Sequence, residues 1–136
     1  MAVIGHATEP IKVLCVDDNA DILLLLTKAI QAEADMACIA ALRDSGELMR
    51  WIESHQPDVV LIDLSIPGVD AFDMIRRIRQ QHEHVRAIVF SGHTDQESVD
   101  AALEAGAWGY VFKNTDLPRV IDAIRRVASG SVSLVC

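Results

Sequence analysis

The strongest constraint on the fold is an alternation that runs along nearly the whole chain. Short apolar runs rich in β-branched residues alternate five times with longer stretches of helical period. This alternation is typical of βα units that build a parallel sheet. The predicted strands are "KVLCV", "MACIAA", "VVLI", "AIVF" and "GYVF", and the three strongest are apolar on both faces, as strands covered by helices must be. The sequence therefore predicts an α/β fold with a five-stranded parallel sheet and five helices.

The first predicted helix covers about residues 20–34, with Asp18 or Asn19 as its N-cap. Helical spacing places one apolar stripe toward the core, formed by Ile22, Leu25, Leu26, Ala29 and Ile30. Leu23 and Leu24 fall outside this stripe. Two interpretations stay open for them, an apolar docking surface for a partner protein or simple cover by a neighbouring helix.

The other helices are predicted from their end signals and apolar faces. Asp44 and Glu47 have capping-box spacing before the second helix, which stops before Pro57. The fourth is expected to start at Thr94 and to end at Gly106, a natural C-cap. The predicted inward faces of the third, fourth and fifth helices contain Phe72, Ile75, Ile78, Val99, Ala102, Leu103, Leu117, Val120, Ile121, Ile124 and Val127.

Length and composition fit one compact domain, since the chain has 136 residues of which 51% are hydrophobic. We expect residues 1–10 to form an N-terminal tail, 11–130 the domain, and 131–136 a C-terminal tail or the start of a linker. The start "MAVIGHATEP" has no signal-peptide pattern, and the longest aliphatic run, "ILLLL", is far too short to span a membrane. We therefore expect a cytoplasmic protein with no membrane partner.

The net charge limits the kinds of partner that the domain can bind, and the cysteine pattern indicates the state of its thiols. A formal net charge of -8 argues against direct nucleic-acid binding by this domain, because gripping a phosphate backbone needs clustered Lys and Arg. Any work on DNA would need another domain. The three cysteines, Cys15, Cys38 and Cys136, have no zinc or redox spacing, so we expect reduced thiols, two of them as small core residues.

Polar residues that can do chemistry follow four of the predicted strands. Asp17 and Asp18 follow "KVLCV", Asp63 follows "VVLI", Ser91 follows "AIVF", and Lys113 follows "GYVF". Ligands of open parallel sheets bind outside the carboxyl ends of the strands, so these side chains should meet. Crowded carboxylates repel one another, and a hard cation such as Mg²⁺ relieves the repulsion. A phosphoryl group would complete the charge balance, with the lysine as its cationic partner and the serine as a donor.

These residues resemble the receiver domains of two-component response regulators, from residue 11 to about residue 130. The resemblance rests on the acidic pair Asp17-Asp18, on "DLSIPG" with Asp63, on "FSG" and on "AGAWGYVFK", in family order and at family spacing. It implies a flavodoxin-like, doubly wound sheet with strand order 2-1-3-4-5. The end of the segment, "AIRRVASGSVSL", is similar to receivers of the NarL/FixJ class.

The resemblance also implies roles for single residues. Asp63 would be the phosphoryl acceptor, taking the group from a sensor histidine kinase. Mg²⁺ or Mn²⁺ would be held by Asp18, Asp63 and the Ser65 carbonyl, with Asp17 acting through a water. The implied switch residues are Ser91, Tyr110 and Lys113. The domain would then be a phosphorylation-activated switch rather than an ordinary enzyme, limited to self-phosphorylation from a phosphodonor and autodephosphorylation.

Two departures from the commonest receiver pattern concern Ala71, where a glycine is usual, and Asn114, where many receivers have a proline in cis. Receivers of the NarL/FixJ class often lack that proline and normally carry a DNA-binding helix-turn-helix domain next. Here the sequence stops at Cys136. Two readings of the output therefore stay open, transcription control through an output domain outside this sequence or a stand-alone receiver that acts by protein–protein interaction. A homodimer that forms on phosphorylation is a further expectation.

Each residue also has a plainer interpretation. A lone aspartate after a strand is usually a turn former or helix cap, and only the combination of residues favours a functional Asp63. Ser91 is alternatively a loop hydroxyl, and Tyr110 an ordinary strand aromatic. His93 and Ser65 occupy positions that tune phosphoryl lifetime in receivers, or are plain surface loop residues.

Two other classes of protein compete with a receiver. A phosphatase of the haloacid dehalogenase type normally has a second Asp where Ser65 stands, which argues against that class. A pseudo-receiver would typically lack the acid pair or the acceptor, and both are present here.

Overall fold

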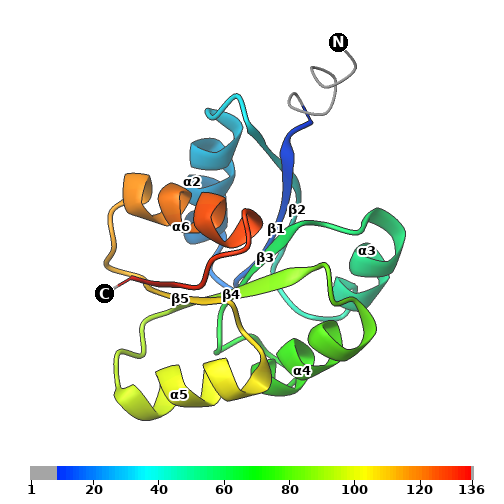
Figure 1. Ribbon diagram of the computed structural model, residues 1–136, viewed down its shortest axis with the longest axis vertical. Coiled ribbons are helices and arrows are strands. Elements are labelled where there is room, and N and C mark those ends of the chain that lie inside the picture. Colours follow the sequence, from blue (N-terminus) through cyan, green and yellow to red (C-terminus); the bar gives the residue numbers. More distant parts are fainter. Residues whose placement is uncertain (1–8, 136) are drawn as a thin grey trace.

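The computed structural model describes residues 9–135, and within them the chain forms one six-stranded sheet with five helices (Figure 1). The strands are all parallel, in the order β2-β1-β3-β4-β5-β6. This confirms the flavodoxin-like order of the first five strands. The elements in chain order are β1 (Ile11–Val16), α2 (Ala20–Gln31), β2 (Met36–Leu42), α3 (Leu48–His55), β3 (Val59–Ile62), α4 (Ala71–Gln81), β4 (Arg86–Ser91), α5 (Gln96–Ala105), β5 (Gly109–Phe112), α6 (Leu117–Ala128) and β6 (Ser133–Val135).

The predicted five-stranded sheet is wrong by one strand, because β6 adds to β5 in parallel. It lies in the stretch 131–136, for which we predicted a tail or linker. Three residues are too few to show an alternating pattern in the sequence, but they pair with backbone groups that β5 would otherwise leave open at the sheet edge. The Ser133 amide donates to the Trp108 carbonyl at 3.0 Å. Gly109 permits this approach, since a Cβ there would lie 2.8 Å from the Ser133 carbonyl oxygen.

Helices cover both faces of the sheet, as the apolar strands require. Figure 1 shows α2 and α6 on one face and α3, α4 and α5 on the other. The side chains of β1 alternate between the two layers, with Val13 and Cys15 under α2 and α6, and Leu14 and Val16 on the opposite side. Within residues 9–135, no helix combines the length and the apolar character that a membrane crossing needs.

Aspartate and asparagine side chains set the starts of four helices. Asn19 caps α2, and its side-chain oxygen accepts from the amides of Asp21 and Ile22 at 2.9 and 3.1 Å. Asp70, Asp95 and Asp116 cap α4, α5 and α6. The fourth predicted helix, which is α5 in the structure, was expected to start at Thr94. This prediction is wrong, because Asp95 is the N-cap residue. Gly106 ends α5 with a φ of 115°, as predicted.

The predicted capping box of α3 is wrong. The Asp44 carboxylate accepts from the Gly46 amide at 2.9 Å and so closes a turn before the helix. Glu47 occupies the N-cap position without a side-chain cap bond.

The phase of α2 also differs from the prediction. Leu23 is buried with 6% of its surface exposed, whereas Leu24 and Leu25 are each 55% exposed. The run "ILLLL" is apolar at every position, so its periodicity does not determine which side faces the sheet. The cap at Asn19 and the contacts of Leu23, Leu26 and Ile30 with the core set the phase.

Candidate functional site

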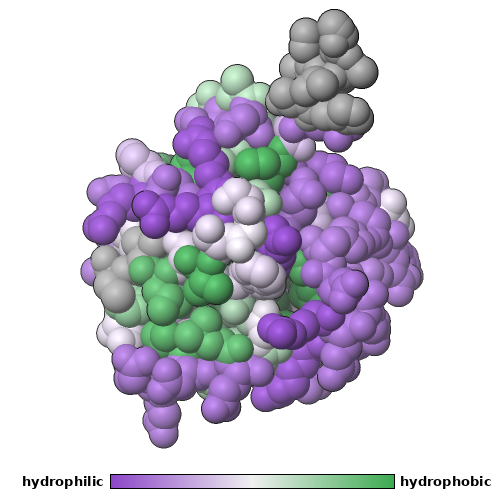
Figure 2. Space-filling model, in the orientation of Figure 1, coloured by the Kyte–Doolittle hydropathy of each residue, from purple (hydrophilic) through white to green (hydrophobic). Residues whose placement is uncertain are grey.

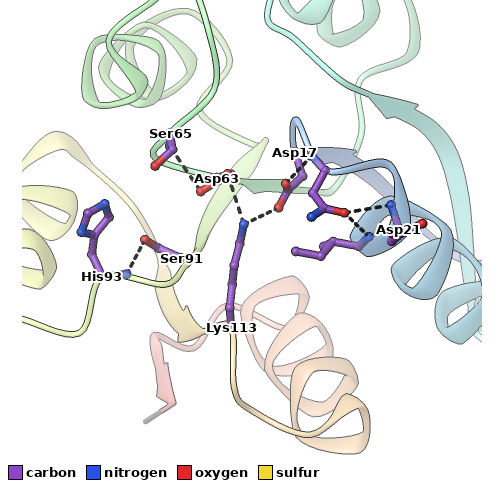
Figure 3. Close-up of polar contacts among 9 residues, drawn as sticks. Asp17, Asp21, Asp63, Ser65, Ser91, His93 and Lys113 are labelled. Carbon is purple, nitrogen blue, oxygen red and sulfur yellow. Dashed lines mark hydrogen bonds and ion pairs between the residues drawn. The ribbon is translucent and has the colours of Figure 1, made fainter.

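The polar residues predicted at the strand ends lie together at the carboxyl edge of the sheet (Figure 3). Asp17 follows β1 and Asp63 follows β3, while Ser91 is the last residue of β4 and Lys113 follows β5. The central position of β1, β3, β4 and β5 in the sheet brings these four ends side by side. The fold therefore places the predicted residues at one edge of the sheet.

Three carboxylates crowd this edge. One oxygen from each of Asp17, Asp18 and Asp63 lies within 4.8 Å of the others. Asp17 and Asp63 are only 1% and 3% exposed, whereas Asp18 faces solvent. Carboxylates this close repel one another, and burial strengthens the repulsion by removing water.

Lys113 neutralises part of this charge. Its ammonium lies 2.9 Å from the Oδ2 of Asp17 and 3.2 Å from the Oδ2 of Asp63 (Figure 3). Burial by itself lowers the pKa of Lys113, but hydrogen bonds and charges from Asp17 and Asp63 outweigh burial and raise the pKa above its ordinary value. The lysine is therefore a cation at neutral pH, and it bridges the two buried acids.

Backbone amides in the following loops hold the other oxygens of these two acids. The Oδ1 of Asp17 accepts from the Asn19 amide at 2.9 Å, and the Oδ1 of Asp63 accepts from the Ser65 amide at 3.2 Å. Each bond spans two residues, so each aspartate closes a tight turn directly after its strand. Both carboxylates are thus fixed from two sides, by a loop amide and by Lys113.

Two of the predicted switch residues, Ser91 and Tyr110, are joined through a single loop residue, His93. The Ser91 hydroxyl is fully buried and accepts from the His93 amide at 3.0 Å. The Tyr110 hydroxyl donates to the His93 carbonyl at 2.7 Å. Mainly because of burial, the pKa of Tyr110 is raised. The sequence offered no signal for this link, because it runs through the backbone of His93 while the side chain of His93 is exposed.

The acidic residues fit a hard divalent cation. They offer oxygen donors only, which Mg²⁺ prefers. The Oδ2 of Asp17 is buried and accepts no well-oriented hydrogen bond from the described residues, so its remaining stabilisation comes from the ion pair with Lys113. An oxygen left in this condition is well suited to bind a cation.

The fold and this site define a flavodoxin-like α/β protein with an acidic cluster at the carboxyl edge of its sheet. Residues 13–125 match the sequence model of the family described as the response regulator receiver domain. The chain belongs to this family, which confirms the predicted resemblance.

Relatives point to the NarL type within the family. The chain is 30% identical over 124 residues to the transcriptional regulatory protein LiaR of Bacillus subtilis, a match that covers 91% of this chain and 59% of LiaR. It is 27% identical over 126 residues to the nitrate/nitrite response regulator protein NarL of Escherichia coli K12, covering 93% of this chain and 58% of NarL. The chain thus spans somewhat more than half the length of these relatives.

A solved structure supports the same assignment. The two-component response regulator of the LuxR family from Aurantimonas sp. SI85-9A1 superposes with a TM-score of 0.86 at 30% identity, over 92% of this chain and 89% of that chain.

Proposed function

We propose that this domain is a phosphorylation-controlled switch of a two-component system in which Asp63 accepts a phosphoryl group. The proposal rests on the contacts of Asp63 with its charged neighbours. The buried carboxylate of Asp63 is 3.2 Å from the Lys113 ammonium and belongs to the same acidic cluster as Asp17 and Asp18. The plainer interpretation of Asp63 as a turn former explains its bond to the Ser65 amide. It does not explain why two further acids and a lysine converge on it.

The proposed transfer is an in-line displacement at phosphorus. A carboxylate oxygen of Asp63 forms a bond to phosphorus while the P–N bond of a phosphohistidine on a sensor histidine kinase breaks, and its electron pair stays on the imidazole nitrogen. A small donor such as acetyl phosphate would lose its P–O bond instead. The product is an acyl phosphate on Asp63.

The residues around Asp63 have distinct proposed roles in this step. Mg²⁺ or Mn²⁺, held by Asp17, Asp18, Asp63 and the Ser65 carbonyl, would supply neutralising charge for the phosphoryl oxygens. Lys113 is already in contact with Asp63, and one of its N–H groups can donate its hydrogen bond to a phosphoryl oxygen instead of a carboxylate oxygen. The same lysine then holds the acyl phosphate in place.

The response to phosphorylation would pass through the loop after β4. The Ser91 hydroxyl hydrogen is available to an acyl phosphate while its oxygen accepts from His93. The Tyr110 ring already lies in the core, 1% exposed, with its hydroxyl on the His93 carbonyl. The expected change is therefore a shift of residues 92–95 together with the bonds of Ser91 and Tyr110, not an inward swing of an exposed ring.

The surface that would report this change is formed by α5, β5 and β6. Figure 2 shows apolar side chains gathered on the part of the surface between α5 and α6. A hollow at the edge of β5 is lined by Thr94, Gln96, Val99, Tyr110, Phe112 and Leu134. The loop that holds Ser91 and the ring of Tyr110 thus border one apolar face, which suits a partner protein or a second copy of the domain.

For the downstream output we propose transcription regulation through a DNA-binding domain elsewhere in the protein. Support comes from LiaR, which is named as a transcriptional regulatory protein and of which the match covers 59%. The charge of -8 speaks against DNA contact by this domain itself. A stand-alone receiver acting by protein–protein interaction is the alternative. In either case the proposed location is the cytoplasm, where the kinase domain of a sensor would meet it.

The decisive experiment is labelling by acetyl phosphate with Mg²⁺, followed by intact-mass measurement. Wild type should gain one phosphoryl group, Asp63→Asn should gain none, and Asp122→Asn, an exposed aspartate on α6, should react like wild type. Labelling that persists in Asp63→Asn would contradict the proposal. Sustained turnover of a phosphate monoester would favour the phosphatase class instead.

A further inference from the structure

The loop after β1 carries two of the three acids of the candidate metal site, and its residues are held in different ways. The Asp17 carboxylate is fixed by Lys113 and by the Asn19 amide. The Asn19 side chain is fixed because it caps α2. Between them, the side chain of Asp18 is exposed and takes no part in the Lys113 bridge. The position of Asp18 therefore depends on what holds its backbone.

The backbone of Asp18 is held by Arg43, which directly follows the neighbouring strand β2. The Nη2 of Arg43 donates to the Asp18 carbonyl at 3.3 Å. The N–H of the same peptide group belongs to Asn19 and donates to the Oδ1 of Asp17 at 2.9 Å. This peptide group is thus held at both ends, at its oxygen by Arg43 and at its nitrogen by Asp17. Rotation of the group would break both hydrogen bonds and redirect the Asp18 side chain.

The backbone on either side of Arg43 is itself fixed. Leu42, the last residue of β2, accepts from the Asp17 amide at 3.0 Å. The Asp44 carboxylate accepts from the Gly46 amide at 2.9 Å and closes a turn. Arg43 therefore reaches the loop after β1 from a backbone that a strand pair fixes before it and a turn fixes after it.

We propose that Arg43 is a positioning residue of the metal site, which holds the peptide group between Asp18 and Asn19 so that the acid pair faces a divalent cation. This inference rests on the proposed function, because that function requires the cation. An arginine suits the task, since its guanidinium is planar, always charged and rich in donors. Partners that orient metal ligands without touching the metal contribute strongly to metal affinity.

A purely electrostatic role of Arg43 predicts the opposite effect on affinity. The guanidinium is a cation beside an acidic cluster, so removing its charge would by itself make the cluster more attractive to Mg²⁺. Removing a positioning contact should make the cluster less attractive. The direction of the change in Mg²⁺ affinity therefore distinguishes the two roles.

The first test is calorimetric titration of Mg²⁺ into Arg43→Met, a variant that loses the charge and the donors but keeps an unbranched side chain. We expect the affinity of the full chain for Mg²⁺ to fall about tenfold. Arg50→Met is the matched control, because Arg50 is an exposed arginine that pairs with Glu47 at the start of α3, and it should bind Mg²⁺ like wild type. Equal or tighter binding in Arg43→Met would overturn the proposal.

The second test needs no metal and follows amide hydrogen exchange by NMR. In Arg43→Met the Asn19 amide should exchange at least several-fold faster, because the freed peptide group can turn away from Asp17. The Asp17 amide, which donates to Leu42, should keep its exchange rate and so show that the strand pair stays folded. An unchanged rate at Asn19, or an equal acceleration at both amides, would contradict the positioning role.

Neither test uses a phosphodonor, so a failure of Asp63 labelling leaves both of them interpretable. Where wild type is labelled by acetyl phosphate, Arg43→Met should react slowly at limiting Mg²⁺ and recover the wild-type rate at saturating Mg²⁺. A rate that stays low at saturating Mg²⁺ would show that Arg43 acts on the phosphodonor, and it would overturn the assignment to the metal site.

Discussion

At the scale of single residues, Lys113 is the group that stabilises the acidic site in the absence of a phosphodonor. It bridges Asp17 and Asp63, whose carboxylates would otherwise face each other while buried. Removing one partner of a buried ion pair typically costs about 3–5 kcal/mol, and 23% exposure of the lysine side chain reduces this to roughly 2 kcal/mol here.

We predict that Lys113→Met lowers the metal-free free energy of unfolding by about 2 kcal/mol, measured by urea denaturation. Because the pKa of Lys113 is raised above its ordinary value of 10.5, its ion pairs contribute their full stability below that value. This stability is lost as the pH rises through the raised pKa. The deficit of the variant should therefore disappear in strongly alkaline buffer. The same variant should bind Mg²⁺ more tightly, since the acids lose their competing cation, yet accept phosphate from acetyl phosphate more slowly. Unchanged stability would show that the bridge is not formed in solution.

Asp18 is predicted to matter for metal binding alone. It belongs to the acidic cluster but is exposed and takes no part in the Lys113 bridge. Asp18→Ala should weaken Mg²⁺ binding about tenfold or more by removing a charged ligand. The unfolding midpoint of the metal-free protein should change no more than it does for an ordinary surface substitution. Calorimetric titration measures the first quantity, and Asp21→Ala, an exposed acid in the first turn of α2, is the matched control. Equal losses in both variants would mean that only overall charge matters.

The residues of this site could be predicted because each follows a strand of a parallel sheet, and strand ends meet. The contacts among them could not. Whether Lys113 bonds to one acid or two depends on side-chain reach across the pocket, and the link between Ser91 and Tyr110 uses the His93 backbone, which has no sequence signature.

At the scale of elements, the exposed apolar surface of α2 belongs to Leu24 and Leu25, not to Leu23 and Leu24 as predicted from the sequence. Leu25 lines a groove with Phe90, Lys113 and Leu117, so an apolar surface continues from α2 to the edge of the acidic site. This position suits a docking surface for the kinase that, under the proposed function, would deliver the phosphoryl group.

We predict that Leu24→Glu and Leu25→Glu slow phosphoryl transfer from the cognate kinase at least several-fold while labelling by acetyl phosphate stays unchanged. Val132→Glu serves as the control, because Val132 is 59% exposed but lies beside β6 instead of α2. Leu23→Glu should instead unfold the domain, since it places a charge in the core. If both phosphodonors slow equally in Leu25→Glu, the change has disturbed the site rather than a docking surface.

The strand β6 gives a second prediction at this scale. A Cβ at position 109 would lie 2.8 Å from the Ser133 carbonyl oxygen, so Gly109→Ala must push β6 away from β5. We expect a loss of roughly 1–3 kcal/mol in stability and faster amide hydrogen exchange in residues 133–135. Gly92→Ala is the control for stability, because a Cβ there meets nothing within 4 Å. Unchanged exchange at Ser133 in Gly109→Ala would show that β6 does not depend on this close approach.

At the scale of the whole molecule, the architecture followed from the sequence because five βα units leave few arrangements open. The strand order required the resemblance, since periodicity does not specify which strands are neighbours. The sixth strand was missed because Ser133–Val135 is short and gains its place only from the open edge of β5. Its presence bears on the proposed output surface, because β6 covers the sheet edge next to Tyr110 and adds Leu134, 51% exposed, to the apolar face.

The final prediction is that phosphorylation changes self-association through this face. A domain of this size reports its state through its surface, and the hydrogen bond from Ser91 and the ion pair from Lys113 to an acyl phosphate would each favour the active arrangement by about 1.5–3 kcal/mol. Either contact is enough to change the ratio of active to inactive arrangements by about tenfold or more when the two are similarly populated. Sedimentation velocity with beryllofluoride and Mg²⁺ should show a shift of wild type toward dimer.

Two variants separate chemistry from signalling in that measurement. Ser91→Ala should still accept phosphate at Asp63 but associate weakly, because it lacks one of the two contacts that couple the acyl phosphate to the loop at 92–95. Leu134→Glu should be labelled normally and stay monomeric, since it places a charge on the apolar face, whereas Leu24→Glu, equally exposed on α2, should associate like wild type. If Leu134→Glu dimerises as wild type does, the pairing uses another surface. If wild type itself sediments identically with and without beryllofluoride, the face beside β6 instead serves a different partner. A partner domain in the same protein chain would then support the transcriptional output. A separate partner protein would support the stand-alone output.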